Sequence, residues 1–187
     1  MASRAFDPRR LDVASFAAQQ GELAGETPAT ALPRLSAATL APADDSSRAD
    51  AHWRVTGQRL PLAGAGLQPS LLIDATTEVT LECQRCLQPM RIALAAERRI
   101  FFVEGEDAAA ALDAESDDDV LALTPTLDLR SLVEDELLLA LPLVPRHEVC
   151  PQPLPRPFVE EEAEASPGEN PFAALASLKL KQGSRPN

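Results

Sequence analysis

Two cysteines three residues apart, Cys83 and Cys86, carry the sharpest chemical signal in the sequence. On a tight turn, two thiolates with this spacing can bind the same tetrahedral metal ion. A second pair with the same spacing, His147 and Cys150, follows about 60 residues later and completes a Cys-Cys-His-Cys donor set suited to structural zinc. The gap is too long for a compact zinc finger, so such a site requires a fold that brings two turns together.

Two other interpretations of the cysteines stay open. The residues alone favour a metal-free hairpin with buried or surface thiols over zinc, and zinc over a redox CxxC. A reactive thiol is favoured by a helix N-terminus, whereas this CxxC lies between two predicted strands. With only three cysteines and no export signal, the sequence does not predict a disulfide scaffold.

The basic residues of the central region are all arginines. Residues 48–99 contain seven arginines and five acidic residues, a net charge of +2, whereas the whole chain carries −12 and the remainder therefore −14. Arginine pairs with phosphate and stacks on bases, which makes Arg85, Arg91 and Arg99 candidate RNA contacts. A solvated face of a sheet explains the same arginines without RNA, and the residues alone favour that explanation.

No catalytic arrangement stands out. The chain has two histidines, His52 and His147, and neither lies in a recognisable nucleophile motif. There is no glycine-rich phosphate loop. The carboxylates of residues 134–136 are expected to form a solvated face near the start of a helix. The sequence therefore predicts a protein that binds and does not catalyse.

Alternation of apolar and polar residues predicts the strands that position the cysteines. Residues 71–83 and 90–103 alternate on either side of the CxxC and predict a hairpin, and residues 53–60 predict a further strand with Trp53 as a core anchor. Asp128 is a suitable N-cap for a helix over residues 129–141, which Pro142 ends. This wide apolar helix is expected to cover the sheet.

The flanks are less regular. The sequence predicts a short amphipathic helix over residues 7–20, mostly loop over 21–43 with a strand at 34–40, a solvated acidic loop over 104–119, and a strand at 119–123. The predicted fold is α+β, with an antiparallel sheet, open or curled toward a barrel, packed by the long helix. We expect an N-terminal segment (1–50), a β-rich core (51–150) and a flexible, acidic, proline-rich tail (151–187).

Composition limits location and partners. The 187 residues are 45% hydrophobic, the opening residues do not resemble an export signal, and the longest apolar run is too short to cross a bilayer, so we expect a cytoplasmic protein. A chain at −12 repels naked RNA over long range, so basic partner proteins are natural targets. The hypothesis is that acidic segments engage basic ribosomal or assembly proteins while the arginine-bearing hairpin touches RNA.

Three ordered motifs together resemble the YceD family, the large ribosomal RNA subunit accumulation proteins. They are residues 79–86 (VTLECQRC), 132–145 (LVEDELLLALPLVP) and 170–179 (NPFAALASLK). The resemblance covers most of the chain from Trp53 onward. It implies a non-enzymatic role in the accumulation or processing of 23S ribosomal RNA during large-subunit assembly. Some members carry a second CxxC after the long helix and resemble zinc proteins; His147 and Cys150 stand at that position here.

The third motif places Phe172, Leu175 and Leu178 in a terminal segment that follows an acidic stretch. This segment is interpreted either as a recognition helix for a partner's groove or as a helix that folds back on its own domain. A zinc-stabilised interaction module unrelated to ribosomes, and a thiol-redox protein, remain the alternative functions.

Overall fold

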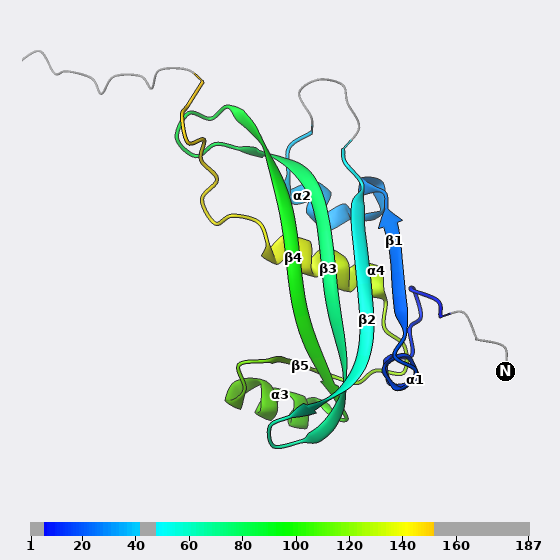
Figure 1. The fold of residues 1–187 in the computed structure, drawn as a ribbon. Coiled ribbons are helices and arrows are strands. Elements are labelled where there is room, and N and C mark those ends of the chain that lie inside the picture. The colour runs from blue at the N-terminus through cyan, green and yellow to red at the C-terminus, as the bar shows by residue number, and fades with distance from the viewer. Residues whose placement is uncertain (1–5, 42–47, 152–187) are drawn as a thin grey trace, which may run out of the picture. The chain divides into compact units, whose positions relative to one another are not determined.

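A computed structural model describes residues 6–41 and 48–151, and these residues form an α+β fold (Figure 1). Strands and helices alternate irregularly along the chain. In order, the elements are α1 (Val13–Ala18), β1 (Glu22–Thr27), a 3-10 turn (Ala29–Ala31), α2 (Pro33–Ala38), β2 (Ala51–Leu62), β3 (Gly66–Glu82), β4 (Pro89–Val103), α3 (Glu106–Glu115), β5 (Asp119–Ala122) and α4 (Leu129–Leu139).

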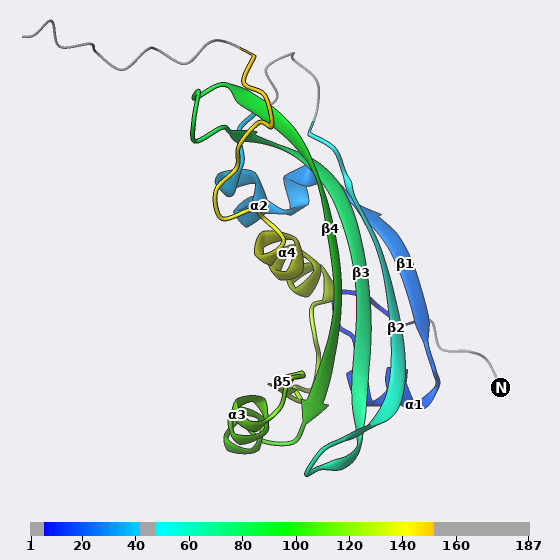
Figure 2. The same cartoon turned by 60° about the vertical axis from the view of Figure 1, so that its left-hand side comes forward.

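The five strands form one sheet in sequence order, β1-β2-β3-β4-β5. The first four are antiparallel to their neighbours, but β5 pairs parallel with the end of β4. The expectation of a purely antiparallel sheet is therefore wrong at this edge, because α3 carries the chain back before β5 begins. Curling toward a barrel is also corrected: the sheet is strongly curved but β1 and β5 do not pair, so it stays open (Figure 2).

The long β3–β4 hairpin follows from the alternation of its residues. β3 has 17 residues and β4 has 15, and their register pairs Val79 with Ile92 and Leu81 with Met90 next to the turn. Apolar residues on alternate positions of β3 are buried, while Thr76 and Glu78 between them are exposed. The predicted hairpin with the CxxC in its connection is confirmed.

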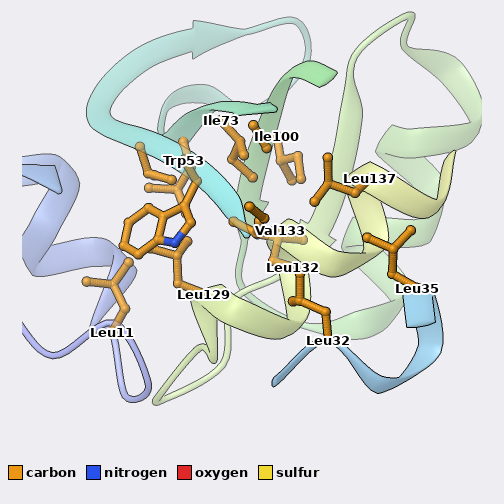
Figure 3. Close-up of a cluster of buried hydrophobic side chains, with 14 of the residues drawn as sticks. Leu11, Leu32, Leu35, Trp53, Ile73, Ile100, Leu129, Leu132, Val133 and Leu137 are labelled. Carbon is orange, nitrogen blue, oxygen red and sulfur yellow. The ribbon is translucent and has the colours of Figure 1, made fainter. Parts of the chain in front are cut away.

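Helix α4 lies on the concave side of the curved sheet (Figure 2), where it buries the apolar stripe formed by Leu129, Val133 and Leu137. Figure 3 shows this helix facing Ile73 and Ile100 of the sheet, with Trp53 beside them. The indole N–H of Trp53 donates to the Thr27 hydroxyl at 2.9 Å, so its polar atom is satisfied inside the core. Both the covering helix and the role of Trp53 agree with the sequence predictions.

A second, smaller cluster closes the far end of β4. Phe101 and Val103 pack with Val120 of β5 and Ala109 of α3, whereas the alternate residues Ile100 and Phe102 belong to the main core. All four consecutive residues at this end of β4 are therefore buried. The predicted acidic loop over 104–119 is corrected here, because residues 106–115 form helix α3. The alanines of this segment favour a helix, and one of them, Ala109, is buried in the cluster. A count of charges does not show either effect.

The N-terminal predictions need three corrections. The first helix is shorter than residues 7–20: it begins after Asp12, whose carboxylate accepts the Ser15 N–H at 3.0 Å. Residues 22–27 form an edge strand, although Ala24 and Gly25 disfavour one, because they pair with β2. The strand expected at 34–40 is wrong, since residues 33–38 form helix α2 with Pro33 in its first turn.

The carboxylates of α4 do not form a solvated face as a group. Glu134 and Glu136 are 4% and 6% exposed. Glu134 accepts the backbone N–H groups of Arg34 and Leu35 at 2.7 and 3.0 Å, and thereby caps α2 from across the core. Glu136 lies 3.3 Å from Arg98. Among the described residues, no helix is long and apolar enough to span a membrane.

Candidate metal centre

The CxxC occupies the connection between the two longest strands. Cys83 follows β3 directly, and its N–H donates to the Gln88 carbonyl at 3.0 Å, while the Leu87 N–H donates to the Cys83 carbonyl at 2.8 Å. These two bonds close a tight loop just before β4. Leu87 adopts a positive φ of 59°, a left-handed conformation that is strained for a leucine. The turn therefore holds both cysteines on a short, constrained stretch of backbone.

The second pair arrives on the chain that leaves α4. After the helix ends, residues 141–151 contain no helix or strand. The Gln84 N–H donates to the Pro145 carbonyl at 2.9 Å and fixes this segment against the CxxC turn. The His147 N–H then donates to the Cys83 sulfur at 3.4 Å. Two turns distant in sequence are thus adjacent in space, as the zinc interpretation requires.

All four predicted ligands come together. The ligand atoms of Cys83, Cys86, His147 and Cys150 lie within 4.8 Å of one another. Cys86 Sγ and His147 Nδ1 are 3.4 Å apart. Cys83 is fully buried and the other three are half-buried, so the cluster has a closed inner side and an accessible outer side. No disulfide joins the three cysteines, which are all free.

The environment of Cys83 stabilises a thiolate. Burial by itself raises the pKa of this thiol, but backbone N–H groups of His147, Arg85 and Cys86 point at the sulfur and together lower the pKa to about 5. For Cys86, burial raises the pKa. The surroundings therefore shift the pKa values of the two thiols in opposite directions. Hydrogen bonds from backbone N–H groups to sulfur also orient a thiolate for metal binding.

The donor set fits a tetrahedral zinc ion. Zinc–sulfur and zinc–nitrogen bonds of about 2.3 and 2.0 Å place the ligand atoms of a tetrahedron roughly 3.5–3.8 Å apart. The 3.4 Å separation of Cys86 and His147 matches this edge. Separations up to 4.8 Å elsewhere in the cluster require a contraction of about 1 Å. Three sulfurs and one imidazole leave no position for substrate, so the chemistry of the set is that of a closed, structural site.

Arg85 lies over this cluster instead of pointing away from the hairpin. Its Nε donates to the Cys150 sulfur at 3.1 Å, and one terminal nitrogen donates to the carbonyls of His147 and Glu148 at 3.1 and 3.3 Å. The hydrogen bond to Cys150 raises the pKa of Arg85. The sequence marks Arg85 by its charge but gives no sign of this contact, because Cys150 lies more than 60 residues away along the chain.

The other two candidate RNA contacts lie on β4, away from the cluster. Arg91 and Arg99 project from the face of the sheet opposite α4, eight residues apart, which is roughly 26 Å along a strand. Arg91 is 3.5 Å from Glu78. The structure therefore does not gather Arg85, Arg91 and Arg99 into one patch. Phe172, Leu175 and Leu178 lie outside the described residues.

The fold and site together define a class: an α+β protein with a one-sided, curved sheet and a Cys3His cluster at the turn of its longest hairpin. Comparison with known proteins then identifies the family. The sequence model described as "Large ribosomal RNA subunit accumulation protein YceD" matches residues 71–179, more than half of the chain. The chain belongs to the YceD family. The match begins at β3, later than Trp53, and includes all four residues of the cluster.

A curated relative from Haemophilus influenzae, the large ribosomal RNA subunit accumulation protein YceD, is 40% identical over 109 residues. The alignment covers 56% of this chain and 62% of the relative, which is less than two thirds of that protein's length. No solved structure gives a significant match.

Proposed function

We propose that this protein is a non-enzymatic factor for the accumulation or processing of 23S ribosomal RNA, and that it acts in large-subunit biogenesis in the cytoplasm. The observation that supports this proposal is the family match over residues 71–179, which spans the hairpin, the covering helix and the Cys3His cluster. The role rests on binding to ribosomal or assembly proteins, to 23S ribosomal RNA or its precursor, or to both.

The test is ribosomal RNA profiling in a strain depleted of the protein. We expect the ratio of 23S to 16S RNA to fall on depletion and to recover with the wild-type chain. A Cys83→Ser/Cys86→Ser double variant should fail to restore the ratio at matched protein levels. Asp135→Asn, a change on the exposed side of α4, should restore it. An unchanged ratio on depletion contradicts the proposal.

We further propose that the cluster holds one structural zinc ion through Cys83, Cys86, His147 and Cys150. When bound, the ion would supply a cross-link between the β3–β4 turn and the segment after α4. Zinc content of the purified protein, measured by mass spectrometry, should approach one ion per chain and fall with Cys86→Ser. Metal-free protein whose Cys83 and Cys86 cycle between thiol and disulfide at physiological potentials would instead support the redox alternative.

Charge suggests the partner. Residues 104–119 carry eight acidic residues and no basic one, and in the structure they include the exposed face of α3. We propose that this surface and the acidic tail engage a basic ribosomal or assembly protein. Pull-downs at low and high salt test this: a basic protein should be recovered at low salt and lost at high salt. Recovery of no such protein under either condition refutes the idea.

We propose that RNA contacts Arg91 and Arg99 of β4. Arg99 has no ion pair within the described part of the chain, and Arg91 faces the same side of the sheet. A double Arg91→Glu/Arg99→Glu variant should lose RNA crosslinks in cells. Arg59→Glu, one charge reversal on β2, is the control for the single variants Arg91→Glu and Arg99→Glu, whose charge change it matches. Equal crosslinking by these variants and the wild type contradicts a β4 contact.

We propose that the terminal motif binds a partner through Phe172, Leu175 and Leu178. Deleting residues 170–187 distinguishes its two interpretations. Unchanged melting temperature with lost partner capture supports recognition by this segment, whereas a large fall in melting temperature supports a helix that packs on its own domain.

A further inference from the structure

The segment that supplies His147 and Cys150 has little apolar packing of its own. Leu143 and Val149 are 101% and 85% exposed, and Val144 is half exposed. A segment without helix, strand or buried side chains has few ways to hold a fixed conformation. Polar contacts with the hairpin are therefore expected to contribute much of what holds it in place.

Those contacts converge on the four residues of the CxxC. The Gln84 backbone holds Pro145, and the Cys83 sulfur accepts the His147 N–H. Three further hydrogen bonds come from one side chain, Arg85, which reaches the carbonyls of His147 and Glu148 and the sulfur of Cys150. Arg85 thus contributes more contacts to the second half of the site than any other described side chain.

The guanidinium group suits this position by shape and by charge. Its planar fork donates in several directions at once, whereas a lysine ammonium on a flexible stem does not reproduce that geometry. Three thiolates and a neutral imidazole around a divalent cation carry a net charge of −1, which Arg85 would neutralise at hydrogen-bond distance. The same side chain would thereby fix the position of the segment through hydrogen bonds and neutralise the net negative charge of the bound site.

We propose that Arg85 is a positioning residue, which holds the His147–Cys150 half of the cluster against the CxxC turn and balances its charge. This proposal rests on the metal assignment above for its second part only. It also makes Arg85 a weaker candidate for RNA contact than Arg91 and Arg99, because its Nε and one terminal nitrogen already have acceptors within the protein.

The experiment compares Arg85→Ala and Arg85→Lys in the full chain. Because Arg85 lies at the surface, its removal leaves no cavity in the core. Zinc affinity, measured by competition with a chromophoric chelator, should fall about 10–100-fold for Arg85→Ala, the range typical of groups that orient metal ligands. Arg85→Lys keeps the charge and loses the fork, so its affinity should lie between the two.

Two variants control for position and charge. Gln84→Ala changes the neighbouring side chain but keeps the backbone bond to Pro145, and Arg146→Ala removes an exposed positive charge from the segment that carries His147. Both should bind zinc within about twofold of wild type. The proposal is overturned if Arg85→Ala binds zinc as tightly as these controls do.

Hydrogen exchange of the metal-free protein separates this inference from the metal assignment. If the wild-type chain binds no zinc, the metal proposal fails, but Arg85 is still tested by amide exchange over residues 145–150. Arg85→Ala should speed exchange there and leave β2 unchanged. Identical exchange in Arg85→Ala, Gln84→Ala and wild type refutes positioning by Arg85.

Discussion

Glu134 offers the sharpest test of how the helices are joined. This residue of α4 is 4% exposed and accepts three hydrogen bonds from α2: the backbone N–H groups of Arg34 and Leu35, and the Arg34 Nε at 3.0 Å. Helix α2 has no side-chain cap of its own. Replacing Glu134 with alanine leaves the N–H of Leu35, which is buried, without an acceptor and without access to water.

The expected cost follows from these bonds. Hydrogen bonds to a charged group contribute about 1.5–3 kcal/mol each, and loss of a helix N-cap costs about 1 kcal/mol. Because the three bonds share one carboxylate, they are not additive, and the free energy of unfolding should fall by about 2–4 kcal/mol. For a domain of this size, the melting temperature should fall by about 5–15 °C.

Urea denaturation followed by circular dichroism measures the loss, with Asp135→Asn as the matched control. Asp135 pairs with the same arginine but is 45% exposed, so water screens the pair and its loss should be far smaller. Glu134→Gln keeps one acceptor oxygen for the two backbone groups and should fall between the alanine variant and wild type. A Glu134→Ala protein no less stable than Asp135→Asn refutes the capping argument.

Three further predictions follow from other residues. Burial raises the pKa of Glu136 above that of an unfolded glutamate, despite the nearby Arg98. The folded state therefore binds this proton more tightly than the unfolded state does, and the contribution of Glu136 to stability falls as the pH rises through its titration. The free energy of unfolding of Glu136→Gln relative to wild type should accordingly increase from pH 4 to pH 7, and a constant difference in urea titrations contradicts this. Leu87→Gly relieves a left-handed backbone at a side chain that is 65% exposed and should raise the free energy of unfolding by about 0.5–1 kcal/mol, whereas an unchanged or lower value argues against strain. Gly57→Ala places a methyl group 2.5 Å from the Phe16 ring and should destabilise the protein by about 1–3 kcal/mol, with a wild-type melting temperature as the contrary result.

The sequence predicts the central hairpin and its helix because their signals are local. The alternation of residues 71–83 and the Asp128 cap describe β3 and α4 without knowledge of the rest of the chain. Edge strand β1 was missed because its Ala24 and Gly25 have weak strand preference, and pairing with β2 overrides that preference. Helix α2 was predicted as a strand because its N-terminal cap, Glu134, lies 100 residues away.

The candidate site shows the same division. Equal spacing of Cys83–Cys86 and His147–Cys150 identifies the four candidate ligands that the structure brings together, although the residues alone favour a metal-free hairpin. The place of Arg85 was not predictable, since its acceptors are backbone carbonyls, which every residue carries and no sequence pattern marks. The pairing of Glu136 with Arg98 was not predictable either, because a count of acidic and basic residues does not tell which of them face the core.

The far end of β4 has a consequence for the motions of this protein. The cluster of Phe101, Val103, Ala109 and Val120 is completed by one residue of β2, Leu62, which is 3% exposed. Helix α3 and strand β5 contact the rest of the sheet mainly through the end of β4 and this leucine, so they can open while β2, β3 and most of β4 stay paired. Any breathing of the sheet should therefore begin at α3 and β5 and stop at Ile100, while the cysteine end keeps its register.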